Sequence, residues 1–339
     1  MPTIGNITTA DFSWGSNLLN ATHVLSDQTV TVTTTGVEDG QVVTLHLNGY
    51  NYPGTVSSHS ATVTITPATR LQALVDGTNY EFIANVSDAA GNAATTITSS
   101  SFTVDKTAPT VSSFTTTTAS GSYKQNDTVV ITANTNEAIQ NGNTITVTLS
   151  DSCGTVVLTA PSAGTTLVGT YTVGAGHTSA GLTVSSFAIG TVADTAGNAM
   201  TSTTLPAASS IFGSKTIVID TTAPASAAAD NIAPLTIGNN TTSIQINVPI
   251  YNDSSLSGGS IQLQMETDNN GTFTDIGTSI AITSSMTNTT TTQSIDLTGT
   301  TLADGNVVTF RPVITDASGN ATTGTEDSTE EFTVDYTPV

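Results

Sequence analysis

The chain has 339 residues, and 26 Asp and Glu against 5 Lys and Arg give it a formal net charge of −21. Such a charge repels a phosphate backbone, which argues against nucleic acid as a partner. No apolar run reaches the roughly 20 residues of a membrane-spanning helix, so we expect no membrane insertion. Thr makes up about a fifth of the chain, and this wealth of β-branched side chains favours an all-β fold.

Short alternating segments predict β-strands along the whole chain. In chain order they are residues 29–33, 42–47, 128–132, 144–149, 243–248 and 261–265. Turn pairs such as Asn48-Gly49 separate them, and Asn270-Gly271 is typical of a hairpin. We expect the Thr tracts 115–118 and 289–292 to be strands or strand edges. Period-2 alternation interrupted at short intervals by turns is typical of an antiparallel β-sandwich.

Two strings recur three times along the chain. The first is Asp-x-x-Gly-Asn, which begins at Asp88, Asp194 and Asp316. The second is a short apolar strand that closes on Asp105, Asp220 and Asp335. These closing aspartates are 115 residues apart in both intervals, 105 to 220 and 220 to 335. An Ig-like sandwich has about 100 residues. We therefore predict three tandem Ig-like domains arranged as a rod, at residues 1–105 (unit one), 106–220 (unit two) and 221–339 (unit three).

The repeated strings resemble the Ig-like repeats of large bacterial surface adhesins that are exported in one step, and those of related surface-layer and fibre proteins. The resemblance rests on the loop 88–92, the junction 220–224 and the run 121–132. It covers nearly all of units one and two and weakens in unit three before Ile314. It implies extender domains that hold a binding domain away from a cell and that stiffen when calcium binds between neighbours.

Sandwich geometry also gathers acidic residues at the two predicted junctions. The last strand of an Ig-like domain ends at the bottom, where the top loops of the next domain begin. The first junction would collect Asp105, Asn136, Glu137, Asp194 and Asn198. The second would collect Asp220, Asn252, Asp253, Asp316 and Asn320. Asp88 and Asn92 would lie at the free top of unit one.

Oxygen ligands without His or Cys favour Ca²⁺, which takes about 6–8 of them. We therefore predict Ca²⁺ at the domain junctions. The alternative is plain turn chemistry, because Asp-x-x-Gly-Asn also closes a tight turn in which Asp bonds its own backbone. Against this alternative, carboxylates gathered closely without a cation repel one another.

Three other candidate sites have weaker support in the sequence. The segment 266–271 matches the first half of a calcium loop, but Gly277 stands where the loop needs Glu, so a plain hairpin is favoured. Trp14 and the segment 50–53 could form a carbohydrate platform, although such aromatic residues more often anchor a core. The histidines and Cys153 show no catalytic spacing, so we predict no enzyme.

These expectations combine into a structural role. We expect a non-catalytic extender segment of a secreted microbial surface protein, either an adhesin or a surface filament, located outside the cell. Its partners would be neighbouring Ig-like repeats or copies of itself, and a glycan or protein of a cell surface. Two alternatives stay open: a filament or surface-layer subunit that assembles by strand exchange, and a glycan-binding module.

Overall fold

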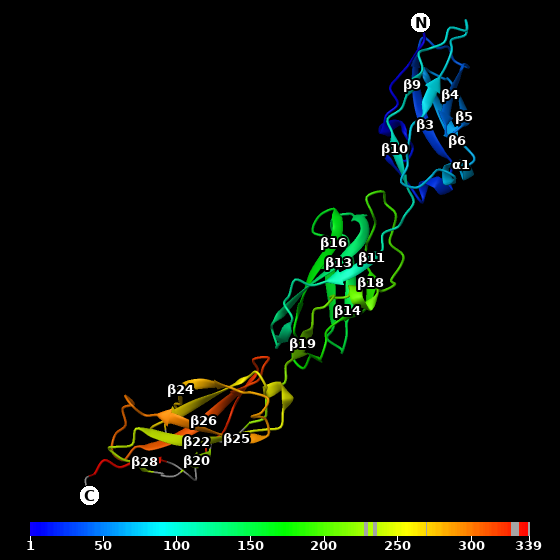
Figure 1. Ribbon diagram of the computed structural model, residues 1–339. Helices are drawn as coiled ribbons and strands as arrows, with labels where there is room; N and C mark the ends of the chain where they lie inside the picture. The colour runs from blue at the N-terminus through cyan, green and yellow to red at the C-terminus, as the bar shows by residue number, and fades with distance from the viewer. Residues whose placement is uncertain (227–229, 233–235, 269, 327–331, 338–339) are drawn as a thin grey trace.

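The computed structural model is built almost entirely from β-strands. It describes residues 1–226, 230–232, 236–268, 270–326 and 332–337. Within these residues the buried apolar side chains form three hydrophobic cores, which span residues 4–104, 111–219 and 237–334. Figure 1 shows the cores one after another along an elongated molecule, with the N-terminus and β28 at opposite ends. The all-β prediction is confirmed, while the boundaries at 105 and 220 stay predictions.

The first core is enclosed by ten short strands. They are β1 (Thr3–Ile4), β2 (Leu18–Asn20), β3 (Gln28–Thr35), β4 (Val42–Leu47), β5 (Tyr50–Thr55), β6 (Ser60–Ile65), β7 (Asn79–Tyr80), β8 (Ile83–Asn85), β9 (Ile97–Thr98) and β10 (Phe102–Asp105). One sheet has the order β1-β3-β6 and a second has the order β5-β4-β8-β9, while β10 lies between β2 and β7. The short helix α1 (Thr69–Gln72) buries Leu71.

Aromatic side chains fill much of the first core. The ring of Trp14 stacks on Phe12 at 4.6 Å between centroids and meets Phe102 edge-on at 5.3 Å. Trp14 and Tyr52 are only 7% and 2% exposed, so they anchor the core and offer no carbohydrate platform. Tyr50 is 46% exposed, and the guanidinium of Arg70 lies over its ring at 4.1 Å.

The second core lies behind a six-stranded sheet of order β11-β13-β16-β15-β14-β18. Its strands are β11 (Val111–Thr115), β12 (Gly121–Tyr123), β13 (Thr128–Ile139), β14 (Thr144–Leu149), β15 (Thr155–Thr159), β16 (Gly164–Thr172), β17 (Thr178–Ser179), β18 (Val184–Ile189) and β19 (Ile217–Asp220). Here β19 lies between β12 and β17. Of the Thr tract 115–118 only Thr115 belongs to a strand. Thr116 and Thr118 use their side-chain oxygens to accept the N–H groups of Thr118 and Val130, so side chains replace ladder partners there.

The third core is enclosed by β20 (Asp230–Ile232), β21 (Thr236–Ile237), β22 (Ser243–Ile250), β23 (Ser260–Glu266), β24 (Thr274–Ala281), β25 (Thr289–Asp296), β26 (Val307–Thr315), β27 (Ala321–Thr323) and β28 (Phe332–Val334). The two sheets have the orders β20-β22-β25 and β21-β28-β26-β23-β24, and β27 pairs with β26. The tract 289–292 begins β25, as predicted. The strands β23 and β24 are antiparallel, and the Glu266 carboxylate accepts the N–H of Gly271. The predicted turn 266–271 includes Asn269, which lies outside the described residues.

One arrangement recurs around all three cores. The last strand pairs in parallel with a strand from the start of the same core: β10 with β2, β19 with β12 and β28 with β21. Parallel partners run in the same direction, so both finish at the same end of the sheet. Around the first two cores, the closing aspartate and the end of its partner strand therefore lie side by side where the next core begins.

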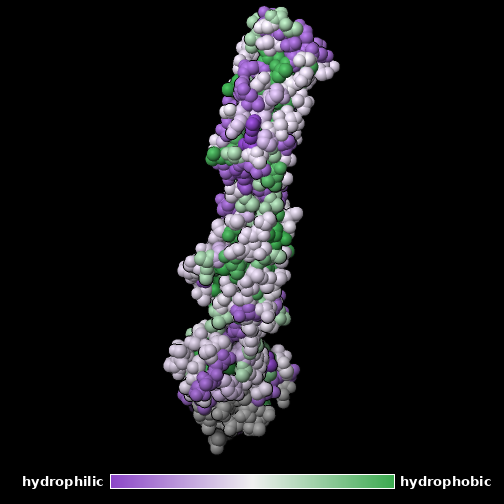
Figure 2. All heavy atoms as spheres, turned by 90° about the vertical axis from the view of Figure 1, so that its right-hand side faces the viewer, coloured by the Kyte–Doolittle hydropathy of each residue, from purple (hydrophilic) through white to green (hydrophobic). Residues whose placement is uncertain are grey.

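Thr side chains cover the outward faces of β3 and β14. Along β3 the buried Val30 and Val32 alternate with Thr31 and Thr33, which point away from the core. On the face shown in Figure 2, hydrophobic residues form isolated patches among residues of intermediate hydropathy. The part of the chain that the structure describes includes no helix with the length and hydropathy to cross a membrane.

Replacing Phe102 with Ala tests whether the cores are independent. Phe102 is 1% exposed within the aromatic cluster, so its loss leaves a cavity that costs about 3–5 kcal/mol. Trp14 is the single tryptophan of the chain and lies in this core, so its fluorescence reports on unit one. Urea unfolding followed at Trp14 is expected to shift to lower urea, while the remaining transitions followed by circular dichroism stay in place.

The matched control is Phe310→Ala, which opens a similar cavity in the third core. It is expected to leave the Trp14 transition unchanged. A joint shift of all transitions in either variant would show that the chain unfolds as one cooperative body.

Candidate metal centre at the first junction

Three carboxylates from two cores meet at the first junction. Asp105 ends β10, whereas Glu137 and Asp194 belong to the second core region, and one oxygen of each lies within 4.8 Å of the other two. Asp194 is 1% exposed and the other two are half-buried. Three carboxylates are the ligand chemistry of a hard cation such as Ca²⁺.

A bulge in β13 presents Glu137 to the junction. The pairing of β13 with β16 shifts register between Asn134 and Ile139, so the intervening residues leave the ladder. The hydroxyl of Thr135 donates to the carbonyl of Glu137 at 2.6 Å and holds this irregular segment. A bulge redirects side chains that a regular ladder would keep on one face, and here it brings Glu137 beside Asp105.

A tight turn positions Asp194. Its Oδ1 accepts the backbone N–H of Asn198 at 2.8 Å, and its Oδ2 accepts the side-chain N–H of the same residue at 2.8 Å. Gly197 has φ +91°, which a residue with a Cβ rarely adopts. Asp88 with Asn92 and Asp316 with Asn320 repeat both bonds. Turn chemistry thus operates in all three copies, and it leaves further lone pairs on each carboxylate.

The asparagines at this junction orient the carboxylates. Asn198 donates from Nδ2 to the carbonyl of Asp105 at 3.0 Å, and its Oδ1 accepts the N–H of Ala21 at 2.8 Å. Asn136 donates to Glu137 at 3.1 Å, and its Oδ1 accepts the N–H of Thr110 at 2.6 Å. Both amide oxygens are thus engaged by backbone N–H groups. The ligand role predicted for these two asparagines stays a prediction.

The three carboxylates are poorly neutralised by the protein. Burial raises the pKa of Asp105, and the charge of Asp194 raises it further. Burial, followed by the charges of Asp105 and Asp194, raises the pKa of Glu137. The neighbouring Lys106 turns away, because its Nζ donates to the carbonyls of Gln72 and Leu74 at 3.1 and 2.7 Å. A bound cation would relieve this repulsion.

The second junction gathers only part of the predicted set. Asn320 donates to the carbonyl of Asp220 at 2.9 Å, and its turn partner Asp316 is 2% exposed. Asn252 is exposed, and Asp253 caps the 3₁₀ turn η4 (Ser254–Leu256) by accepting the N–H of Ser255 at 2.9 Å. Among the described residues, the group of three mutually close acidic ligands occurs at the first junction alone.

At the free top of unit one, the turn of Asp88 and Asn92 stands without a preceding closing strand in the described chain. The hydrogen bond from Asn92 lowers the pKa of Asp88. Glu38 contributes by accepting the N–H of Ala89 at 2.8 Å. The predicted pair is therefore together, and the third partner found at the junctions is absent from the described residues.

Sequence reasoning missed Asp76, which ties the linker to unit one. Its carboxylate accepts the N–H of Lys106 at 2.5 Å and the hydroxyl of Thr107 at 2.6 Å, and the bond from Thr107 lowers the pKa of Asp76. Asp304 similarly accepts the N–H of Tyr336 at 2.6 Å. The signal was an Asp-Gly pair some 30 residues before the closing aspartate in units one and three.

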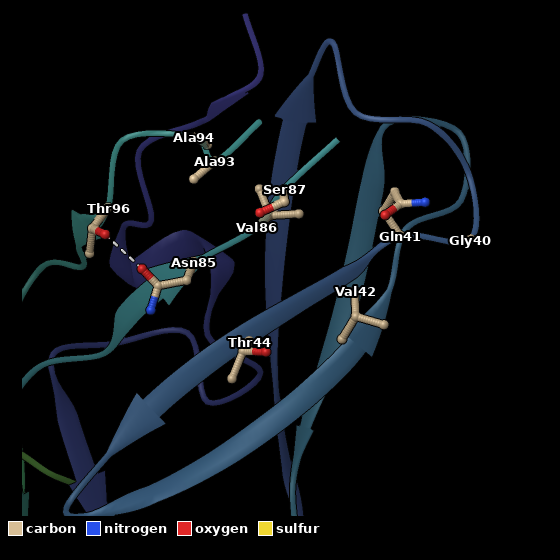
Figure 3. A pocket seen from close by; sticks show the side chains of 10 residues that line it. All are labelled: Gly40, Gln41, Val42, Thr44, Asn85, Val86, Ser87, Ala93, Ala94 and Thr96. Atoms are coloured by element: carbon tan, nitrogen blue, oxygen red, sulfur yellow. Dashed lines mark hydrogen bonds between the residues drawn. The ribbon is translucent and has the colours of Figure 1, made fainter. Parts of the chain in front are cut away.

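An open cleft lies elsewhere, between β4 and residues 85–96 of unit one. It encloses about 510 Å³, and its walls include Gln41, Thr44, Asn85 and Ser87. Figure 3 shows these polar groups around the opening and the hydrogen bond from Thr96 to Asn85, which is 2.6 Å long. The lining offers hydroxyl and amide groups but no carboxyl, imidazole or thiol group to act as an acid or base.

Cys153, for which the sequence showed no catalytic spacing, lies in the second core. Its side chain is 1% exposed in the second core, and burial raises the pKa of its thiol. A raised thiol pKa lowers the fraction of reactive thiolate.

Comparisons with known proteins leave the family open. No protein-family model matches the chain, and no curated protein matches it. A structure from a 1.5-MDa bacterial ice-binding adhesin, studied for host cell surface retention, is similar with a TM-score of 0.49 and 19% identity over 99% of this chain and 98% of that one. Domains 4–9 of the surface layer protein SbsC are similar with a TM-score of 0.22 and 14% identity over 91% of this chain and 42% of that one. Salmonella alpha-2-macroglobulin reacted with methylamine gives a TM-score of 0.22 and 10% identity over 92% of this chain and 20% of that one. All three TM-scores are below 0.5.

Replacing Glu137 with Gln tests the carboxylate repulsion in metal-free protein. A raised pKa in the folded state means that the protonated form is favoured by folding, so this contribution to stability is present below the ordinary pKa and is lost as the pH rises through the folded value. In a chelator, E137Q is expected to raise the Tm of unit two by about 1–3 °C at pH 7 and by nothing measurable at pH 3.5. Differential scanning calorimetry at the two pH values measures this.

Glu81→Gln is the control, because it removes the same charge from an exposed residue away from the junctions. It is expected to change the Tm at neither pH. An equal rise at both pH values for E137Q would mean that packing, rather than charge, is responsible.

Proposed function

We propose that this chain is a non-catalytic extender segment of a secreted microbial surface protein, stiffened by Ca²⁺ at the first junction. The observation that carries the proposal is the meeting of Asp105 from one core with Glu137 and Asp194 from the next. A cation held by ligands from two rigid bodies restricts their relative motion. The site is thus placed to control the shape of the chain.

The ligand chemistry favours Ca²⁺ over other ions. The three residues of the site are all carboxylates. None of them is the thiolate or imidazole that zinc and copper prefer. Mg²⁺ demands a strict octahedral shell and keeps most of its water, whereas Ca²⁺ accepts an irregular shell. An affinity of about 10⁻⁴–10⁻³ M would match extracellular calcium modules.

The surface role is supported by shape, by surface chemistry and by the resemblance of the repeated strings. The three cores follow one another, with the N-terminus and β28 at opposite ends (Figure 1), which suits a spacer. The partners we propose are neighbouring repeats or copies of this chain, together with a glycan or protein of a cell surface. Filament formation and glycan recognition remain the alternative functions.

A calcium titration of chelated protein tests the proposal. A ligand that binds only the folded state stabilises it by about 2.7 kcal/mol at 100 times its dissociation constant. Ca²⁺ at about 10 mM, which is roughly 10–100 times the dissociation constant of about 10⁻⁴–10⁻³ M given above, is therefore expected to raise the Tm by several degrees. It is also expected to fix the maximum dimension measured by small-angle X-ray scattering. The double variant Asp105→Asn/Glu137→Gln is expected to lose both responses.

Glu81→Gln serves again as the matched control and is expected to keep both responses. Mg²⁺ at the same concentration is expected to give a smaller rise. Calcium-independent Tm and maximum dimension in the unmodified protein would rule out the calcium part of the proposal.

A further inference from the structure

The two junctions place different residues at one equivalent position. Asn20 ends β2 and pairs directly with Asp105 of β10. Around the second core, β12 and β19 pair in the same parallel manner, with Tyr123 opposite Ile219. One step further along both chains, Lys124 follows Tyr123 and Asp220 follows Ile219. Lys124 therefore occupies at the second junction the place that Asn20 occupies at the first.

Both residues make the same kind of contact with the next unit. Asn20 donates from Nδ2 to the carbonyl of Ala196 at 2.9 Å. Lys124 donates from Nζ to the carbonyl of Gly319 at 2.9 Å. Each acceptor belongs to the Asp-x-x-Gly-Asn turn of the following unit, and the longer lysine reaches one residue further along that turn.

The turn glycines make room for these donors. A Cβ built on Gly197 would lie 3.2 Å from Nδ2 of Asn20, and a Cβ built on Gly319 would lie 3.1 Å from Nζ of Lys124. Contacts this short are tighter than ordinary van der Waals packing. The glycine that gives each turn its positive φ thus also admits the crossing side chain, which makes the two contacts structurally equivalent.

The two donors differ in charge. The Asn20 amide is neutral. The same junction holds the carboxylates of Asp105, Glu137 and Asp194, and the Nζ of Lys106 donates to carbonyls of unit one instead. The Lys124 ammonium brings a positive charge to a turn whose acidic neighbours are Asp220 and Asp316. Lys124 is one of only 5 basic residues in the chain. A hydrogen bond from an ionised donor is about twice as strong as a neutral one.

We propose that Lys124 is a built-in cation of the second junction, so that of these two junctions only the first depends on Ca²⁺ for its rigidity. Only the part of this inference that concerns Ca²⁺ at the first junction rests on the proposed function. The chain then has one joint that is set permanently by its sequence and one joint that follows the calcium concentration.

Distances between spin labels across each junction test the proposal. Cysteines introduced at the exposed Thr62, Thr170 and Thr278, taken in successive pairs, span the first and the second junction. The native Cys153 is 1% exposed and is replaced by Ser if it reacts. In the unmodified sequence we expect the distribution of spin-label distances across the first junction to narrow when Ca²⁺ replaces the chelator. The distribution of distances across the second junction is expected to be narrow in both conditions.

Two reciprocal substitutions separate the lysine from calcium. Lys124→Asn is expected to broaden the second-junction distribution about two-fold in chelator, and Lys124→Arg is expected to keep it narrow. Asn20→Lys is expected to narrow the first-junction distribution in chelator. Unit two is expected to keep its Tm in K124N, because Lys124 is exposed and touches neither core.

An unchanged second-junction distribution in K124N would overturn the proposal, as would narrowing of the second junction by Ca²⁺ in the unmodified sequence. A first junction that ignores Ca²⁺ would overturn the proposed function instead. It would leave the effect of K124N intact, so the two failures are distinguishable.

Discussion

The hydrogen bond from a turn asparagine to the carbonyl of the preceding closing aspartate joins successive cores at both junctions. Asn198 makes it to Asp105 at 3.0 Å, and Asn320 makes it to Asp220 at 2.9 Å. It requires the turn to present its asparagine and the closing strand to end at one fixed place. The parallel pairing of each closing strand with an early strand of the same core, β10 with β2 and β19 with β12, supplies that place.

This bond alone is too weak to fix the angle between two successive cores. A neutral hydrogen bond contributes about 0.5–1.5 kcal/mol net, and part of that is lost where water competes. The junctions therefore need a further interaction, one that involves charged groups. At the first junction three close carboxylates make a bound cation the natural partner, and at the second the ammonium of Lys124 reaches the following turn directly. The same backbone arrangement thus allows the positive charge to come from a bound cation at the first junction and from a lysine side chain at the second.

Much of this organisation could be predicted from the sequence because it repeats. The strand alternation and the 115-residue spacing of the closing aspartates predicted the all-β fold and the meeting of Asp105 with Glu137 and Asp194. The directions of the asparagine side chains could not be predicted, since they depend on which N–H groups the folded loops leave in need of an acceptor. The cap that the Asp253 carboxylate gives to η4 could not be predicted either, because it is a local bond that the position of a loop in the sandwich does not indicate.

The crossing residues were missed for a different physical reason. The position of Asn20 and Lys124 is set by a parallel register with the last strand, and no local pattern of residues records that register. The rarity of basic residues was the available signal, because a lysine in a chain with a net charge of −21 has many acidic partners to choose from. Lys106 and Lys124 both lie next to a junction. Lys106 turns back and donates to the carbonyls of Gln72 and Leu74 in unit one, whereas Lys124 reaches forward to Gly319 in unit three. The sign of a charge near a junction therefore does not show which unit the side chain binds, because that depends on the direction of the side chain. The direction distinguishes a junction that needs an added cation from a junction that has a cation of its own.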